Sequence, residues 1–226
     1  MEVVGVDACG KLGWVGIRLV DGRYAGGVVD VRLETLIART PQARVVAVDM
    51  PLGLMGEKWR DADHGAKDLL GARRSSVFMV APEAAWQEAT HADASEVCRQ
   101  LTGSGLSAQA WALRDKLLEA RACWTADPAR VFEVHPEVSF FALAGRTPLL
   151  FPKKTWRGQM LRRNLLADAG IGLPDALGEA DRVPVDDVLD AAAAAWSAHR
   201  IATGASKSVP AVPQLDAGGR AVEIRY

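Results

Sequence analysis

Short apolar runs, rich in β-branched residues and separated by glycine turns, fill the first fifty positions of the chain. The first three runs are EVVGVD, WVGIRLV and YAGGVVDV. They predict three strands, joined by the turn ACGKLG and by the Asp-Gly hairpin signal in DGRY. After a short amphipathic helix at RLETLIART, the continuous apolar run ARVVAVDMPLGL predicts a central strand covered on both faces. This region therefore predicts an antiparallel meander followed by a buried strand.

The pattern becomes helical between about residues 56 and 128, where alanine, arginine and acidic residues dominate. Helical spacing is clear in DADHGAKDLLGARR and in SAQAWALRDKLLEARACW. We therefore expect a largely helical insertion between the fourth strand and the next one.

Strand character returns at ARVFEV and passes into a short helix at PEVSFFALAG. Two strong helices follow at TWRGQMLRRNLLADAG and VPVDDVLDAAAAAWSAHRIATG, and QLDAGGRAVEIRY predicts a final hairpin. The sequence therefore predicts one α/β domain over residues 1–226. It consists of a mixed five-stranded sheet whose first three strands form the meander, with flanking helices and the helical insertion.

Composition narrows the range of functions. The 226 residues carry a formal net charge of −1, so a nucleic-acid contact would depend on local basic patches. Three scattered cysteines suit neither a zinc site nor a disulfide framework. The first residues lack a signal-peptide pattern, and no apolar run approaches the ~18 residues of a transmembrane helix. We expect a cytoplasmic protein without a membrane partner, and nothing in the sequence indicates a homodimer.

Acidic residues occur where predicted strands end and on one late helix. Asp7 ends the first strand and Asp49 the fourth, so the two side chains share a sheet edge if these strands are neighbours. On the late helix, either Asp187 or Asp186 shares a face with Asp190. Carboxylates that meet at one point repel one another, and a divalent cation relieves that repulsion. Mg²⁺ or Mn²⁺, which prefer oxygen ligands, are the expected cofactors, and these acids are the candidate catalytic residues.

Most of these acids also have a simpler explanation. Asp7 and Asp49 suit turns, Asp186 suits the N-cap of the late helix, and Asp187 complements its dipole. Asp190 is harder to explain in this way, because it lies one turn inside an apolar helix and a buried unpaired Asp is rare. The metal-site prediction rests on the combination.

The stretch FEVHPEVSF adds two candidates. His135 could orient water or a leaving group, and Glu137 could join the acids if the strand continues through Pro136. Alternatively, Glu137 opens the next helix and His135 satisfies the backbone. The sequence is compatible with both roles of these two residues.

Basic residues are the candidates for phosphate binding. Arg73, Arg74 and Ser76 lie in GARRSSVF, which predicts either a phosphate-binding loop or a solvated one. Lys154 belongs to the basic cluster in PKKTWRGQMLRR, which suits either a nucleic-acid backbone or a charged helix surface. Lys11 lies in the glycine turn DACGKLG, which is compatible with phosphate binding.

The chain resembles the RNase H-like superfamily and, within it, the family called domain of unknown function 429, described as predicted RNase H-like nucleases. The resemblance runs from about Val3 to Arg200. It is carried by the stretches VGVDACGKLGWV, AVDMPLGL, GARRSSVF, EVHPEVSFFALAG, KKTWRGQMLRR and VDDVLDAAAAAWSAHR.

Three of these stretches, the first two and the last, are also similar to the Holliday-junction resolvase branch, whose acids bind two Mg²⁺ ions. By position, the resemblance places metal binding on Asp7, Asp49, Asp187 and Asp190. The fourth-strand acid is normally Glu in that branch, and Asp49 is shorter.

The resemblance implies an RNase H-like fold and a metal-dependent nuclease that hydrolyses phosphodiester bonds of DNA or RNA by a two-metal-ion mechanism. Two alternatives stay open. One is a small-phosphometabolite or nucleotide-binding enzyme on the related actin-like plan, although the sequence has no evident duplicated half. The other is a catalytically silent RNase H-like binding module.

Overall fold

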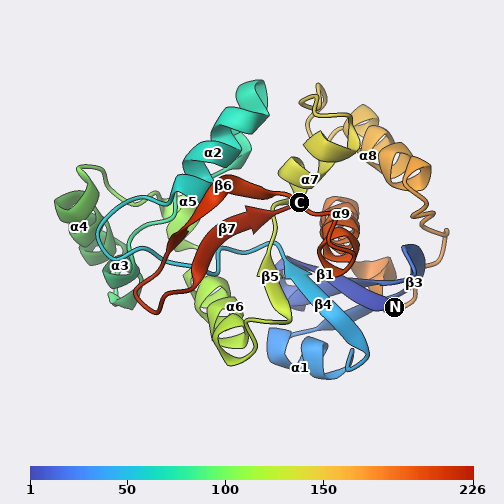
Figure 1. The fold of residues 1–226 in the computed structure, drawn as a ribbon, viewed down its shortest axis with the longest axis horizontal. Coiled ribbons are helices and arrows are strands. Elements are labelled where there is room, and N and C mark those ends of the chain that lie inside the picture. Colours follow the sequence, from blue (N-terminus) through green and yellow to red (C-terminus); the bar gives the residue numbers. More distant parts are fainter.

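A five-stranded mixed sheet forms the centre of the protein, which is described over all residues 1–226 by a computed structural model (Figure 1). The spatial order is β3-β2-β1-β4-β5. The strands are β1 (Glu2–Ala8), β2 (Trp14–Val20), β3 (Arg23–Asp30), β4 (Ala43–Val48) and β5 (Val131–Glu133). The first three strands pair antiparallel, whereas β1, β4 and β5 run parallel. This is the RNase H-like topology, and it confirms the predicted sheet.

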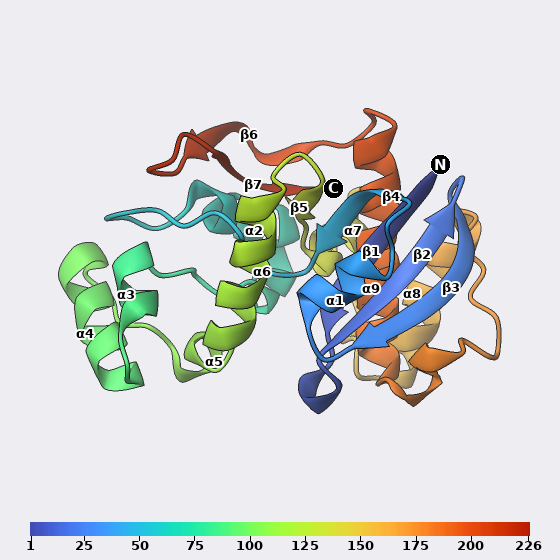
Figure 2. The same cartoon turned by 90° about the horizontal axis from the view of Figure 1, so that it is seen from below.

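Helix α9 (Val185–Ala202) covers one face of the sheet and packs most closely on β1 (Figure 2). Its run of buried alanines allows this close packing, because the short alanine side chains let the helix backbone approach the sheet. A Cβ at Gly5 of β1 would lie only 1.8 Å from the backbone nitrogen of Ala195. Glycine at this position therefore sets how close the helix comes to the sheet. Helices α7 (Pro136–Leu143) and α8 (Trp156–Asp168) pack against α9.

The opposite face of the sheet is covered by α1 (Leu33–Ala38) and by residues from the segment between β4 and β5. Val4, Val6, Val46 and Val48 belong to the core on this face, whereas neighbours such as Val45 and Ala47 belong to the core beneath α9. Both faces of β4 are therefore buried, as its continuous apolar sequence predicts.

The segment between β4 and β5 is mostly helical. Its helices are α2 (Asp61–Leu70), α3 (Glu83–Gln87), α4 (His91–Thr102), α5 (Ala108–Trp111) and α6 (Arg114–Ala126). A short 3-10 helix, Gly71–Ser76, follows α2. In Figure 2, α6 lies nearest the sheet, whereas α3 and α4 lie at the far side of this segment.

A two-stranded sheet of β6 (Ser208–Leu215) and β7 (Ala221–Arg225) contacts both the helical segment and the edge of the central sheet at β5. Strand β6 packs on α2, and Arg225 of β7 forms a bridge to Val134 just beyond β5. The hairpin is longer than the sequence pattern predicts. Pro210 and Pro213 interrupt the pattern of β6, because proline cannot donate to a strand ladder. No helix has the combination of length and apolar character needed to cross a membrane.

Candidate active site

Three carboxylates meet at one edge of the sheet. Asp7 is the penultimate residue of β1, Asp49 directly follows β4, and Asp190 lies in the second turn of α9. One carboxylate oxygen from each lies within 4.8 Å of the other two. Parallel pairing brings the carboxyl ends of β1 and β4 together, and the Asp49 backbone nitrogen donates to the Val6 carbonyl at 2.8 Å. The topology therefore assembles the acidic cluster from three distant parts of the sequence.

The other two acids of α9, Asp186 and Asp187, lie outside the cluster. Pro184 is the N-cap residue, so Asp186 and Asp187 both lie in the first helical turn. Asp187 lines the cavity that contains the cluster and is half-buried. Burial is the main cause that raises the pKa of Asp187, and the negative charge of the neighbouring Asp186 adds to the increase. Asp187 thus lies beside the cluster but outside the three acids whose oxygens meet.

Burial and mutual repulsion disfavour the ionised form of the three carboxylates. Burial is the largest cause that raises the pKa of Asp7 well above its usual range, and the negative charges of Asp49 and Asp190 raise it further. Burial raises the pKa of Asp49 to about 7 even though Lys153 opposes the shift. Burial also raises the pKa of Asp190 to about 7, again against Lys153 and with Asp49 adding to the increase. Shifts of this kind arise when carboxylates share a site with too little compensating positive charge.

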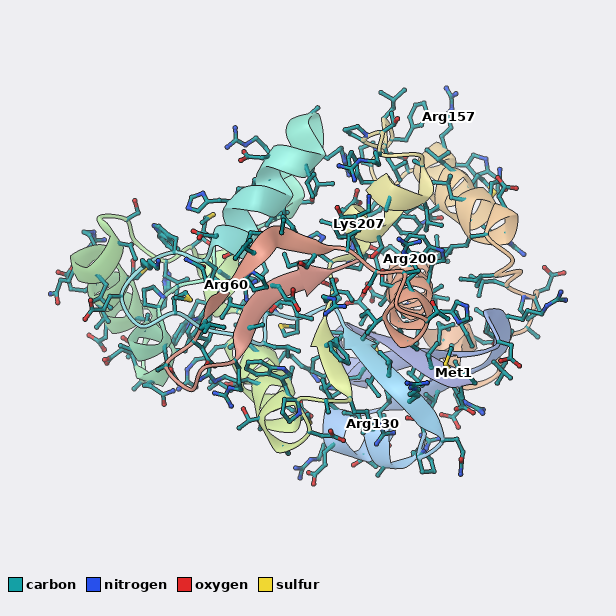
Figure 3. The ribbon with its side chains drawn as sticks, in the orientation of Figure 1. Met1, Arg60, Arg130, Arg157, Arg200 and Lys207 are labelled. Carbon is teal, nitrogen blue, oxygen red and sulfur yellow. The ribbon has the colours of Figure 1, made fainter.

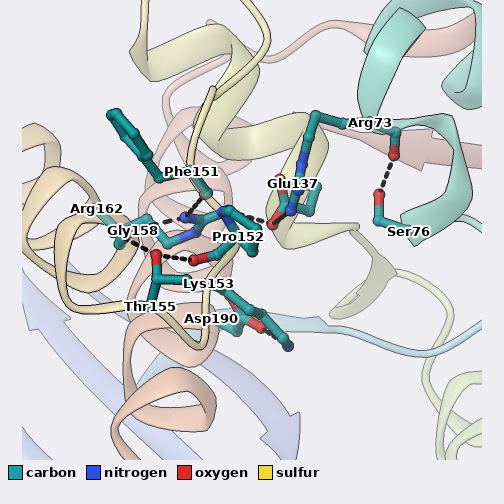
Figure 4. A network of polar contacts seen from close by, with 10 residues as sticks. All are labelled: Arg73, Ser76, Glu137, Phe151, Pro152, Lys153, Thr155, Gly158, Arg162 and Asp190. Atoms are coloured by element: carbon teal, nitrogen blue, oxygen red, sulfur yellow. Dashed lines mark hydrogen bonds and ion pairs between the residues drawn. The ribbon is translucent and has the colours of Figure 1, made fainter.

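Lys153 supplies positive charge at the cluster. Its ammonium lies 2.5 Å from Asp190 Oδ2 and reaches it from the loop between α7 and α8 (Figure 4). Burial lowers the pKa of Lys153, but Asp190, Asp7 and Asp49 more than offset this, so the pKa lies above its ordinary value. The neighbouring Lys154, which is the lysine predicted from the sequence to bind substrate, is exposed. No periodic pattern covers this loop, so the residues alone do not show which lysine turns inward.

Glu137 is occupied by two arginines. It lies in the first turn of α7, which begins at Pro136, so the strand does not continue through this position. The fully buried Arg162 donates to its Oε1, and Arg73 lies 3.6 Å from the same oxygen (Figure 4). Arg162 also donates to the Phe151 and Gly158 carbonyls at 3.1 Å. Arg162, which the sequence groups with a basic surface cluster, is therefore an internal residue that joins α8 to α7.

A second buried network of charged residues, Arg60, Asp63 and Glu133, lines the same cavity. Arg60 contacts Asp63 at 3.0 Å and donates to Glu133 at the end of β5. Glu133 also accepts from the Leu52 backbone nitrogen at 2.7 Å, and burial raises the pKa of Asp63 to about 6 against the effect of Arg60. Figure 3 places Arg60 beside β6 and α2, in contrast to Arg157 at the outer end of α8. Arg60 and Asp63 are absent from the predicted site residues, although their spacing of three residues at a helix start is the signal that could have revealed them.

One cavity of about 380 Å³ is lined by the acidic cluster, Asp187, Lys153, Glu137 and the network of Arg60, Asp63 and Glu133. Among the predicted substrate-binding residues, Arg73, Ser76 and His135 line it. Ser76 Oγ donates to the Arg73 carbonyl at 2.8 Å (Figure 4). Burial lowers the pKa of His135, and its Nδ1 is buried without a hydrogen-bond partner.

The other predicted substrate-binding residues, Lys11, Arg74 and Lys154, are exposed and do not line the cavity.

The donor set has a clear chemical preference. Asp7, Asp49 and Asp190 offer only carboxylate oxygens, which suit hard cations such as Mg²⁺ and Mn²⁺. Asp190 is 3% exposed, and its Oδ1 is buried without a hydrogen-bond partner. A buried carboxylate oxygen of this kind requires a cation or a proton. The arrangement is therefore consistent with a metal-dependent active site.

Comparison with known proteins gives one family. The family model described as "Protein of unknown function (DUF429)" matches residues 5–215, which is nearly the whole chain. Searches of curated proteins and of solved structures gave no match.

Proposed function

The chain belongs to the DUF429 family, and on that premise we propose that its acidic cavity is the active site of a metal-dependent nuclease. The reaction is hydrolysis of a phosphodiester bond. The observation that carries this proposal is the meeting of Asp7, Asp49 and Asp190 at the carboxyl edge of an RNase H-like sheet.

The three acids would hold Mg²⁺ or Mn²⁺, with Asp187 beside them as a further candidate ligand. The unpartnered Asp190 Oδ1 supports this assignment, as do the raised pKa values of the cluster. Bound there, such ions supply Lewis-acid stabilisation of a phosphoryl group and a water of lowered pKa.

The remaining residues of the cavity would position the substrate. Arg73 and Ser76 face the cluster from the 3-10 helix and suit a phosphate oxygen. Burial keeps His135 neutral at pH 7, so it would orient water or a leaving oxygen as a neutral group. Glu137 would act indirectly, by holding Arg73 in place through its ion pair.

Calorimetry with Mn²⁺ tests the metal site. We expect the wild type to bind Mn²⁺ and the variant Asp7→Asn/Asp190→Asn to lose binding at least tenfold while keeping its circular dichroism spectrum. Wild-type protein that ignores both Mn²⁺ and Mg²⁺ would contradict the assignment and favour a silent binding module. Loss of hydrolysis in Asp7→Asn, with the fold intact, is the corresponding test of catalysis.

A further inference from the structure

The acidic cluster lies inside a cavity, and Asp7 and Asp190 are only 6% and 3% exposed. We infer that the substrate enters as a single terminal nucleotide of a short or single-stranded nucleic acid, and that duplexes and strand interiors are excluded. This inference rests on the proposed function and adds the class of substrate to it.

The size of the cavity gives the first argument. A volume of about 380 Å³ lies near the lower end of the range of about 300–1,000 Å³ that small-molecule sites occupy. A nucleotide is a ligand of this scale, whereas a base-paired duplex presents its phosphates along a wide, continuous surface. A phosphodiester can therefore reach buried carboxylates only where the chain ends or the nucleotide stands alone.

The distribution of polarity within the cavity gives the second argument. The lining combines the acids and Lys153 with three apolar side chains, Phe78, Val80 and Leu113, which we call the apolar wall. These three residues come from the helical segment between β4 and β5, and Phe78 and Leu113 are only partly buried. A nucleotide has the matching division, because its phosphate is anionic and its base offers an apolar face.

One cationic side chain of the lining suits an anionic ligand. Arg73 lines the cavity, and its side chain is 22% exposed, so a ligand oxygen can approach the guanidinium. The charge of Arg73 favours a phosphate there.

Overall charge agrees with recognition of one nucleotide. Tight binding along a polynucleotide comes from neutralising many phosphates with a broad basic surface. The chain has a formal net charge of −1, so its overall charge gives no sign of such a surface.

The reaction balances with water as the only co-reactant. Water oxygen forms a bond to phosphorus, and the bond between phosphorus and the leaving sugar oxygen breaks. The proton lost by the water is matched by the proton gained by that oxygen. The products are a nucleoside monophosphate and a strand that is one nucleotide shorter.

A panel of substrates with Mn²⁺ tests the inference in wild-type protein. The panel contains bis(4-nitrophenyl) phosphate, dinucleotides, linear single strands of DNA and RNA, and covalently closed single-stranded circles of the same sequence. We expect mononucleotide release from the linear substrates and at least 100-fold slower cleavage of the circles. Comparable cleavage of circles and linear strands would overturn the inference but support the proposed nuclease. If bis(4-nitrophenyl) phosphate and every nucleic acid stay intact, both the proposed function and this inference fail.

A cavity-filling variant tests the apolar wall through binding. The probe is a dinucleotide whose bridging oxygen is replaced by methylene, so that it cannot be hydrolysed. We expect Leu113→Trp to weaken binding of this probe at least tenfold and to leave Mn²⁺ affinity within twofold. Leu101→Trp, on the partly exposed surface of α4 and outside the cavity, is the control and should bind as the wild type does. Unchanged probe affinity in a folded Leu113→Trp variant would overturn the inference.

Discussion

The Lys153 ammonium lies 2.5 Å from Asp190 Oδ2, where it offsets part of the negative charge of three converging carboxylates. A lysine in this position and a metal ion bound by the same carboxylates act on the same charge. Lys153 should therefore stabilise the metal-free protein and weaken its affinity for cations.

Replacement of Lys153 by methionine tests this competition. We expect a loss of about 2 kcal/mol in unfolding free energy without metal, between the values for exposed and buried ion pairs, because the side chain is 35% exposed. Mn²⁺ should bind several-fold more tightly, since Asp190 Oδ2 is released. Denaturant titration and calorimetry measure the two effects. Lys154→Met is the matched control, and equal behaviour of the two variants would contradict the prediction.

The stability of the metal-free protein should depend on pH in an unusual direction. Burial raises the pKa values of Asp49 and Asp190 from an ordinary value of 3.8 to about 7 in the folded state. The folded state therefore binds more protons than the unfolded state between about pH 4 and pH 7. This contribution to stability is fully present below pH 4 and is lost as the pH rises through 7.

We expect the loss to amount to a few kcal/mol across that window. Asp7→Asn/Asp190→Asn, which lacks two of the groups, should show a smaller slope. Added Mn²⁺ should stabilise the wild type more at pH 7.5 than at pH 5.5, because it binds the deprotonated acids. Thermal unfolding at several pH values measures all three, and a pH-independent effect of Mn²⁺ would refute the prediction.

The buried pair of Arg162 and Glu137 should be important for stability. Arg162→Leu leaves the Glu137 carboxylate with only the 3.6 Å contact to Arg73, and we expect a loss of about 3–5 kcal/mol. Arg163→Leu, one residue along the same helix, removes an exposed pair with the fully exposed Asp175 and should change little. Urea titrations of the two variants give the comparison. A small loss for Arg162→Leu would show that Glu137 relaxes to another partner or takes up a proton.

Gly5→Ala should damage both stability and the site. The added Cβ would lie 1.8 Å from the Ala195 backbone, so α9 must shift away from β1, at a cost of about 3 kcal/mol or more. Because α9 carries Asp190, Mn²⁺ affinity should fall as well. Gly172→Ala is a suitable control, since a Cβ there meets nothing within 4 Å. Wild-type Mn²⁺ affinity in a folded Gly5→Ala variant would show that the helix position does not control the cluster.

The sequence predicts the parts of this protein that follow regular patterns. Strand runs and their terminal acids correctly place Asp7 and Asp49 at one sheet edge. Asp190 lies beside them as the resemblance implies, whereas helical spacing alone pairs it only with Asp187 or Asp186. The loop that carries Lys153 follows no such period, so its inward direction emerges only from tertiary packing.

Partners of buried charges are equally hard to infer. Arg162 and Arg163 have the same residue type and adjacent positions, yet one is fully buried and the other is exposed. Their difference depends on where α7 lies relative to α8, and no local propensity contains that information. The contact of Arg60 with Glu133 likewise depends on how β5 and α2 are placed, whereas the spacing of Arg60 and Asp63 is visible in the sequence.

The close packing of α9 on β1 also has a consequence for the order of folding. Asp7 lies in the first of the five strands, whereas Asp190 is synthesised only after all five strands and the helical segment. Ile224 of β7, which lines the same cavity, comes later still. Contacts between such distant segments form slowly because a long loop must close first. During synthesis, the nascent chain therefore carries Asp7 and Asp49 at a sheet edge before the cavity is complete, and the lining is completed only when the hairpin of β6 and β7 docks.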